Sequence, residues 1–257
     1  MRLEDSAQSK LHLTYCLNIH PGESWEENLT AIRTHACAVR ERVAPGKAFG
    51  LGLRLSALAA DELYRAENLT AFQAFLRAHD LYVFTVNGFP FGRFHGTRVK
   101  AAVYAPDWRS EERVAYTLKL GGILCALLPL DVEGSISTVP GTYRAWSRDN
   151  GDLLAVLRGL GRAVVGLRDL HARTGRKVRL ALEPEPDCLW DTTGQMIELF
   201  NDILPAAGAD LLVAEFGISP DEGRRLWLDY LGVCFDTCHQ AVMFEGVVQG
   251  LEALRDA

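Results

Sequence analysis

The chain has 257 residues, 48% of them hydrophobic and 23% charged, which is the composition of a folded globular protein and excludes a disordered or collagen-like one. Its net charge of -6 gives no general attraction to a phosphate backbone, so no nucleic-acid partner is expected. No run of 18 or more apolar residues occurs, and the polar start MRLEDSAQSK is unlike a signal peptide. We therefore expect a cytoplasmic protein without stable membrane insertion.

Short apolar segments rich in β-formers alternate along the chain with longer segments of helical period. The expected strands cover residues 11–20, 49–56, 81–89, 133–139, 177–183 and 231–236. Helices are expected at about 25–43, 61–79, 110–127, 150–174, 193–207, 220–229 and 244–256. The pattern of residues 211–216, LLVAEF, fits either a strand or a continued helix.

The alternation of strands and helices predicts the fold class. Three of the expected helices begin with the spacing of a capping box: Ser24 with Glu27, Thr192 with Gln195, and Ser219 with Glu222. Strands joined by such helices need right-handed crossovers, so we expect an α/β protein with a parallel sheet buried on both faces. An open doubly wound sheet would be favoured by a glycine-rich phosphate loop after the first strand, which the chain lacks. A TIM barrel predicts chemically able residues after several strands, as found here.

The number of strand–helix units fits a complete barrel only in part. Six units fill the 257 residues, whereas eight units of the same length would need on the order of 340. No linker or repeat divides the chain. We therefore expect one TIM-barrel-like domain over residues 1–257 that lacks the last two strand–helix units and is incomplete at its C-terminal end. The exposed edges of such a barrel would favour dimerisation or aggregation.

The strongest chemical cluster is GVCFDTCH, residues 232–239. An apolar run brings Asp236 to the end of a buried strand, and His239 follows three positions later, so the two side chains can converge. A carboxylate with an imidazole suits Zn²⁺, Mn²⁺ or Co²⁺ better than Ca²⁺, which prefers oxygen ligands. The alternative is that Asp236 caps the next helix and His239 lies in a polar turn.

A second cluster, LALEPEPD, places Glu183 at the end of an apolar strand and Glu185 two positions further on. In an extended backbone both carboxylates face the same side, and Pro184 and Pro186 keep the segment extended. Such a pair can bind a metal ion and move a proton. It can equally be a surface turn with two solvated acids, and both interpretations stay open.

The segment NGFPFGRFHG, residues 87–96, can close over a small ligand, with its glycines as hinges. It contributes His95, which is either an acid/base group or a packing histidine. Together with residues at other expected strand ends, the candidate substrate-binding residues are His20, Asn87, Phe89, Phe91, His95, Ser137 and Thr138. The other histidines upstream of residue 232 are interpreted as structural or solvent-facing: His12, His35, His79 and His171.

Several sequence blocks resemble a known family. GVCFDTCH, with LALEPEP upstream, resembles the xylose-isomerase-like TIM barrels, the superfamily of sugar and sugar-phosphate isomerases and epimerases that also contains endonuclease IV. A wider set of blocks, from Leu13 to Ala241, resembles the EboE-type metabolite traffic proteins. These blocks are LTYCLNIHPGESW, NGFPFGRFHG with VKAAVYAPDW, GSISTVPG, LEPEPDC and GVCFDTCHQAV.

The resemblance implies roles for particular residues. Glu183 would be the metal-binding glutamate of the fifth strand, and Asp236 and His239 would bind the same divalent ion, Zn, Mn or Co. In isomerases of the superfamily an acidic residue on the eighth strand completes the metal site and often acts as the second acid/base. This sequence has no matching position, which leaves the activity of the 257-residue chain by itself open.

Three functions compete. The first is a metal-dependent isomerase or epimerase for a small sugar-phosphate or polyol-like metabolite in an Ebo-type metabolite traffic pathway, with Glu183, Glu185 and His95 as catalytic groups. The second is a non-catalytic component that binds or traffics a metabolite in the same pocket. The remote third is an endonuclease IV-like DNA repair enzyme, which the absence of a basic stripe disfavours. The sequence points to no protein partner.

Overall fold

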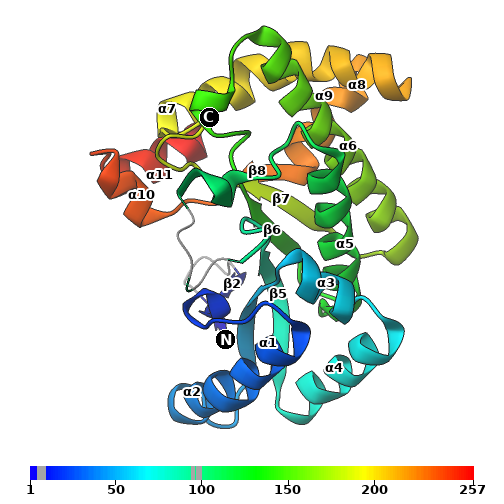
Figure 1. The fold of residues 1–257 in the computed structure, drawn as a ribbon, viewed down its shortest axis with the longest axis vertical. Helices are drawn as coiled ribbons and strands as arrows, with labels where there is room; N and C mark the ends of the chain where they lie inside the picture. Colours follow the sequence, from blue (N-terminus) through cyan, green and yellow to red (C-terminus); the bar gives the residue numbers. More distant parts are fainter. Residues whose placement is uncertain (5–9, 94–95, 97–99) are drawn as a thin grey trace. The chain divides into compact units, whose positions relative to one another are not determined.

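The fold is an α/β arrangement around a six-stranded sheet in which the strands follow chain order (Figure 1). The computed structural model describes residues 1–4, 10–93, 96 and 100–257. The strands of the sheet are β3 (Thr14–Cys16), β4 (Phe49–Arg54), β5 (Leu81–Asn87), β6 (Gly134–Thr138), β7 (Val178–Leu182) and β8 (Leu231–Val233). The pairs β3–β4, β4–β5 and β7–β8 are parallel. Parallel strands in chain order, joined by helices, are the arrangement predicted from the alternation.

The chain divides into two compact units. The first comprises Met1–Val103, Lys119–Ile136 and Leu170–Val178, and the second comprises Tyr104–Leu118, Ser137–Asp169 and Arg179–Ala257. The strands β6 and β7 and the helices α5 (Glu111–Leu127) and α6 (Asn150–Thr174) each have residues in both units. The single-domain organisation expected from the sequence stays a prediction.

In the first unit, every residue of β4 is buried. Glycine is required at position 50, because a Cβ there would lie 2.7 Å from the carbonyl oxygen of Leu13 and 2.8 Å from a ring carbon of Phe84. The predicted helix 25–43 is present as α1 (Trp25–Ala31), a π-helical stretch η2 (Ile32–Ala36) and α2 (Cys37–Val43). Its capping box is confirmed, since Ser24 and Glu27 each bond the other's backbone N–H.

Two expectations for the first unit were wrong in detail. The strand predicted over residues 11–20 is interrupted: β2 (Lys10–His12) pairs antiparallel with β1 (Arg2–Glu4), whereas β3 pairs parallel with β4 and gives way to a 3-10 turn, η1 (Leu17–Ile19). The chain therefore changes its pairing partner at Leu13, whose N–H bonds the carbonyl of Met1. The helix predicted over 61–79 is two helices, α3 (Ala57–Leu63) and α4 (Ala66–Ala78).

The second unit contains most of the helices of the C-terminal half. They are α7 (Thr193–Glu198), η5 (Leu199–Gly208), α8 (Ala209–Phe216), α9 (Pro220–Tyr230), α10 (Thr237–Val242) and α11 (Val247–Asp256), with 3-10 turns including η4 (Arg144–Trp146). Helix α6 approaches the loop before α5 very closely, because a Cβ at Gly159 would lie 1.9 Å from the carbonyl oxygen of Trp108. Glycine is therefore required where this helix meets the loop.

The segment whose periodicity was ambiguous, residues 211–216, is helical. It forms α8, which continues α7 and η5 without a break, so the helix that starts at Thr193 ends at Phe216 and not at 207. Pro205 lies in the π-helical stretch η5, where the regular bonding pattern is already changed. The capping box of Thr192 and Gln195 is confirmed. Ser219 also caps its helix, but the carboxylate of Glu222 bonds Arg168 and the box is half formed.

No single helix in the described ranges has the length and hydropathy that a membrane span needs. Two helices together have this length and hydropathy, Thr193–Phe216 and Pro220–Tyr230, but they are bent by 111° relative to each other. Several of its apolar side chains, Met196, Leu212 and Trp227 among them, are buried in the structure.

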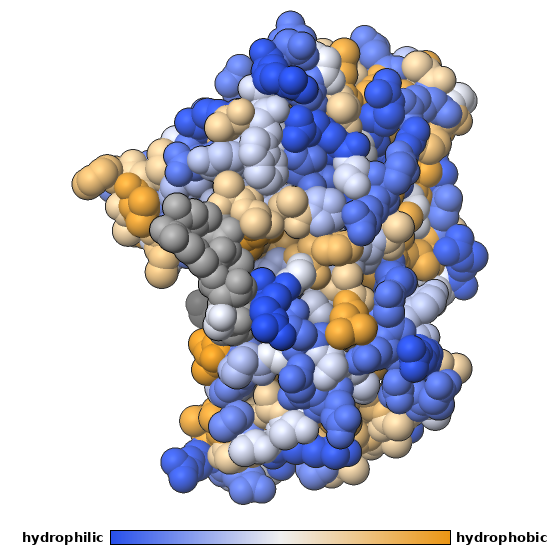
Figure 2. Space-filling model, in the orientation of Figure 1, coloured by the Kyte–Doolittle hydropathy of each residue, from blue (hydrophilic) through white to orange (hydrophobic). Residues whose placement is uncertain are grey.

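Exposed apolar side chains gather on α10 and α11, where Figure 2 shows a hydrophobic surface at the left edge of the view. They are Val242, Phe244, Val248 and Leu251. Phe244 is 97% exposed and has a positive φ of 59°, a backbone conformation that bulky side chains rarely adopt. This surface belongs to the same unit as the acidic and histidine residues discussed next.

Candidate metal centre

Three side chains that follow β7 and β8 come together in the second unit. Glu183 follows β7 directly, Asp236 is the N-cap of α10 after β8, and His239 lies in the first turn of α10. One ligand atom from each of the three lies within 4.8 Å of the others. The carboxyl ends of neighbouring parallel strands lie at the same edge of a sheet, which is why residues far apart in sequence meet here.

The imidazole of His239 is oriented by the backbone. Its Nδ1 lies 2.8 Å from the carbonyl oxygen of Pro184, and only a protonated Nδ1 can donate to a carbonyl. The Nε2 atom of the neutral ring therefore carries the lone pair, and it lies 3.6 Å from Oδ2 of Asp236. A histidine held in this way by its other nitrogen is typical of metal ligands.

Asp236 is placed to act both as the cap of α10 and as a metal ligand, the two interpretations made from the sequence. Its Oδ1 accepts a hydrogen bond from the backbone N–H of Cys238 at 2.7 Å, which caps α10. Its Oδ2 is the atom that lies near His239. Capping and ligand presentation use different oxygens, so the two interpretations are compatible.

The surroundings of Glu183 disfavour the ionised form of its carboxyl group. Burial, the largest influence, raises the pKa of its carboxyl to about 7, the nearby Asp236 and Glu185 raise it too, and His239 lowers it. Its backbone N–H donates to the carbonyl of Thr138 at 3.0 Å, which fixes the strand end that carries it. A buried carboxylate next to a second acid is the arrangement that a bound cation would stabilise.

The donor set fits a divalent transition-metal ion. Two carboxylates and one imidazole are ligands that Zn²⁺, Mn²⁺ and Co²⁺ accept, and three protein ligands leave coordination positions open. Within the ranges that the structure describes, these are the three His, Cys, Asp or Glu side chains whose ligand atoms converge this closely. Glu183, Asp236 and His239 were the ligands expected from the sequence.

A fourth side chain, Glu185, lies beside this group. Burial raises the pKa of its carboxyl, and His239 and Asp236 are both close enough to influence it. The phenol of Tyr104 donates to its Oε1 at 3.3 Å. Sequence reasoning did not single out Tyr104, because nothing in its spacing relates it to an acid 81 residues away. The only available signal was its position in the block VKAAVYAPDW.

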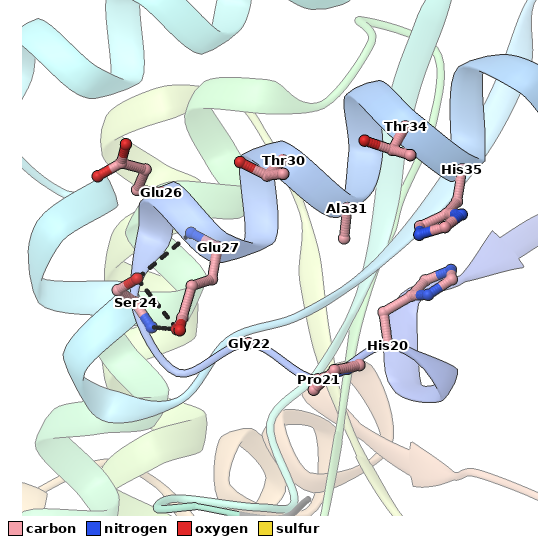
Figure 3. Close-up of a pocket in the computed structure, with 10 residues that line it drawn as sticks. All are labelled: His20, Pro21, Gly22, Ser24, Glu26, Glu27, Thr30, Ala31, Thr34 and His35. Atoms are coloured by element: carbon pink, nitrogen blue, oxygen red, sulfur yellow. Dashed lines mark hydrogen bonds between the residues drawn. The ribbon is translucent and has the colours of Figure 1, made fainter.

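Five of the seven expected substrate-binding residues fall in the first unit, and the structure describes four of them. His20 stacks on His35, with ring centroids 4.2 Å apart and planes 7° from parallel, and its Nε2 lies 2.7 Å from the Tyr15 hydroxyl. The two rings lie at one end of an open groove of about 680 Å³ along α1 (Figure 3). His35, interpreted as structural or solvent-facing from the sequence, lines this groove together with His20.

The remaining candidates differ in their surroundings. The Oδ1 atom of Asn87 accepts from the backbone N–H of Phe89 at 2.9 Å, which closes a local turn, and the Phe89 ring is buried. The carbonyl of Phe91 accepts from Ala57. His95 lies outside the described residues. In the second unit Ser137 is half-buried and Thr138 fully buried. For all of these residues a role in substrate binding stays a prediction.

The comparisons with known proteins support the fold. No protein-family model matches the chain, and no curated protein matches its sequence. The chain is similar to the crystal structure of the probable 3-DHS dehydratase AsbF, involved in petrobactin synthesis, from Bacillus anthracis. The TM-score is 0.51 at 13% sequence identity, over 96% of this chain and 70% of that one. This likeness shows that the chain has the expected xylose-isomerase-like TIM-barrel fold, and membership of the EboE-type group stays a prediction.

Proposed function

We propose that the chain is a metal-dependent enzyme, an isomerase or epimerase for a small sugar-phosphate or polyol-like metabolite. The observation that carries the proposal is the convergence of Glu183, Asp236 and His239, with Nδ1 of His239 bonded to the Pro184 carbonyl and its Nε2 near Asp236. The fold likeness to a probable dehydratase supports an enzyme with a small-molecule substrate. A cytoplasmic location and a place in an Ebo-type metabolite traffic pathway belong to the same proposal.

When bound, a Zn²⁺, Mn²⁺ or Co²⁺ ion would polarise oxygens of the substrate as a Lewis acid. The residues of the chain do the rest. Glu183, Asp236 and His239 would hold the ion, and the Pro184 carbonyl keeps the His239 ring in the tautomer that such binding needs. In the isomerase reaction Glu185, next to them, would take a proton from the hydroxyl-bearing carbon beside a carbonyl group and return it to the former carbonyl carbon, while the hydroxyl proton moves to the former carbonyl oxygen.

A second candidate reaction is favoured by the fold likeness. Dehydration of a substrate of the 3-DHS kind, the reaction named for AsbF, would start with the same proton removal by Glu185 and end with loss of a hydroxyl group, which takes up that proton and leaves as water. The isomerase proposal and the dehydratase alternative therefore share the metal ligands and the base. They differ in the product, which a screen of substrates distinguishes.

The proposal is tested by metal analysis of the purified chain and of an Asp236→Asn variant. Asparagine caps helices as well as aspartate does, so α10 should form while the ligand charge is lost. The wild-type chain should bind close to one equivalent of Zn²⁺, Mn²⁺ or Co²⁺, and the variant should bind it at least tenfold more weakly. Asp202→Asn, a change at an exposed aspartate, is the matched control.

Two results would overturn parts of this proposal. A wild-type chain that binds none of the three ions would remove the metal site and the reaction with it. A chain that binds metal and metabolites but turns over no sugar phosphate, polyol or 3-DHS would support the non-catalytic binding function instead.

A further inference from the structure

Two glutamates separated by one residue lie next to the same metal ligands. Glu183 and Glu185 flank Pro184, whose carbonyl oxygen lies 2.8 Å from Nδ1 of His239. A divalent cation attracts every carboxylate within reach, yet the proposed reaction needs one glutamate as ligand and the other as an uncoordinated base. A contact is therefore needed that keeps one of the two glutamates from binding the ion.

The Tyr104 hydroxyl contacts the side-chain carboxylate of Glu185. It donates to Oε1 of Glu185, and the phenol stays protonated because burial, followed by the charge of Glu185, raises the pKa of Tyr104 far above its usual value. A phenol in this state is a permanent donor to the carboxylate and a poor metal ligand. The Tyr104 side chain is 9% exposed.

Tyr104 is held in place by contacts with the loop that leads to and includes Tyr143. Its ring stacks on Tyr143 with centroids 5.3 Å apart and planes 5° from parallel. The segment that follows it is tied to the loop before Tyr143: Trp108 donates to the carbonyls of Gly141 at 3.2 Å and Val139 at 3.0 Å through its backbone and ring N–H groups. The hydroxyl of Thr142 donates to Asp107 at 2.5 Å.

The same loop holds the turn that carries Glu185. The backbone N–H of Arg144 donates to the carbonyl of Asp187, and that of Leu189 donates to the carbonyl of Thr142, both at 2.8 Å. Tyr143 also forms a β-bridge with Cys188. The segments that follow Tyr104 and Glu185 are thus both bonded to the same loop, which supports the contact between the two side chains.

We infer that Tyr104 is a positioning residue that keeps the Glu185 carboxylate out of the coordination sphere of the metal ion. This inference rests on the proposed metal site. Loss of the phenol hydroxyl would free Glu185 to rotate toward Glu183, Asp236 and His239 and to join them as a fourth protein ligand. The enzyme would then hold its metal more tightly and lose its free base.

Cobalt(II) is the probe, because its visible absorption bands change in position and intensity with the number and type of ligands. Tyr104→Phe removes only the hydroxyl and keeps the ring that stacks on Tyr143. Tyr143→Phe is the matched control: it removes a hydroxyl from the other ring of the stack. Glu185→Gln and the Tyr104→Phe, Glu185→Gln double variant complete the set, and thermal unfolding shows that each variant is folded.

The expected result is a Tyr104→Phe spectrum that differs from wild type and a Co²⁺ affinity that rises about tenfold. Tyr143→Phe and Glu185→Gln should keep the wild-type spectrum, and the double variant should return to it. An unchanged spectrum and affinity in Tyr104→Phe would overturn the inference and leave the metal site intact. So would an altered spectrum in Glu185→Gln, a result that stays informative if Tyr104→Phe does not fold. A wild-type chain without Co²⁺ binding would overturn the proposed function as well.

Discussion

Replacing Glu183 with glutamine tests whether the three converging residues are arranged for a cation. In the metal-free chain, burial raises the pKa of this carboxyl from 4.5 to about 7, and its side chain is 14% exposed. A raised pKa in the folded state means that ionisation destabilises the fold. Stability present below pH 4.5 is therefore lost as the pH rises through 7. At 1.36 kcal/mol per pKa unit the loss is about 3 kcal/mol.

Glutamine cannot ionise, so metal-free Glu183→Gln should equal wild type in stability near pH 4.5 and exceed it at pH 8 by about 3 kcal/mol. For a chain of this size, the difference corresponds to a rise in Tm of roughly 6 to 12 °C. The assay is thermal and urea unfolding in EDTA from pH 4.5 to 8.5. Glu252→Gln, at an exposed glutamate, makes the same chemical change as a control.

Added metal should narrow the difference in stability between the two proteins at pH 8. At 100 times its Kd, a bound ion stabilises the wild-type chain by about 2.7 kcal/mol, whereas the variant lacks one ligand and gains less. If metal-free wild type and Glu183→Gln differed in stability by the same amount at every pH, the reasoning would be refuted. It would also fail if Zn²⁺, Mn²⁺ and Co²⁺ all left the wild-type Tm unchanged.

Three further changes test the fold by urea unfolding. Gly159→Ala places a Cβ 1.9 Å from the Trp108 carbonyl oxygen and should lower the free energy of unfolding by about 3 kcal/mol or more. The control is Gly194→Ala, whose added Cβ meets nothing within 4 Å and should not lower it. Equal effects of the two changes would contradict the close approach. Thr192→Ala removes the cap of α7 and should cost about 1 kcal/mol, and no loss would argue against the capping box. Phe244→Asn should stabilise by up to about 1 kcal/mol, because asparagine tolerates a positive φ; destabilisation would mean that the ring makes contacts.

The parallel sheet and the closeness of Asp236 to His239 could be predicted because both follow from local patterns. Apolar runs separated by helical segments imply parallel strands in chain order. Asp236 and His239 are three positions apart, whereas Glu183 was joined to them by the family resemblance, and the three come together at the ends of neighbouring strands. Capping at Ser24 and Thr192 was equally local.

What could not be predicted depends on contacts between distant residues. The strand expected over 11–20 is divided because β2 and β3 have different partners, and the amino-acid pattern is the same on both sides of Leu13. Helix formation by residues 211–216 follows from their continuity with η5, which an apolar run does not reveal. The pairing of Tyr104 with Glu185 depends on a loop that neither residue belongs to.

The division of the chain into two units separates two sets of residues. Glu183, Asp236, His239, Glu185 and Tyr104 all belong to the second unit, whereas the groove lined by His20 and His35 belongs entirely to the first. The two sets share no residue, so a substitution in one set leaves the amino acids of the other unchanged. Binding in the groove and binding at Glu183, Asp236 and His239 are therefore two properties that separate sets of variants can test.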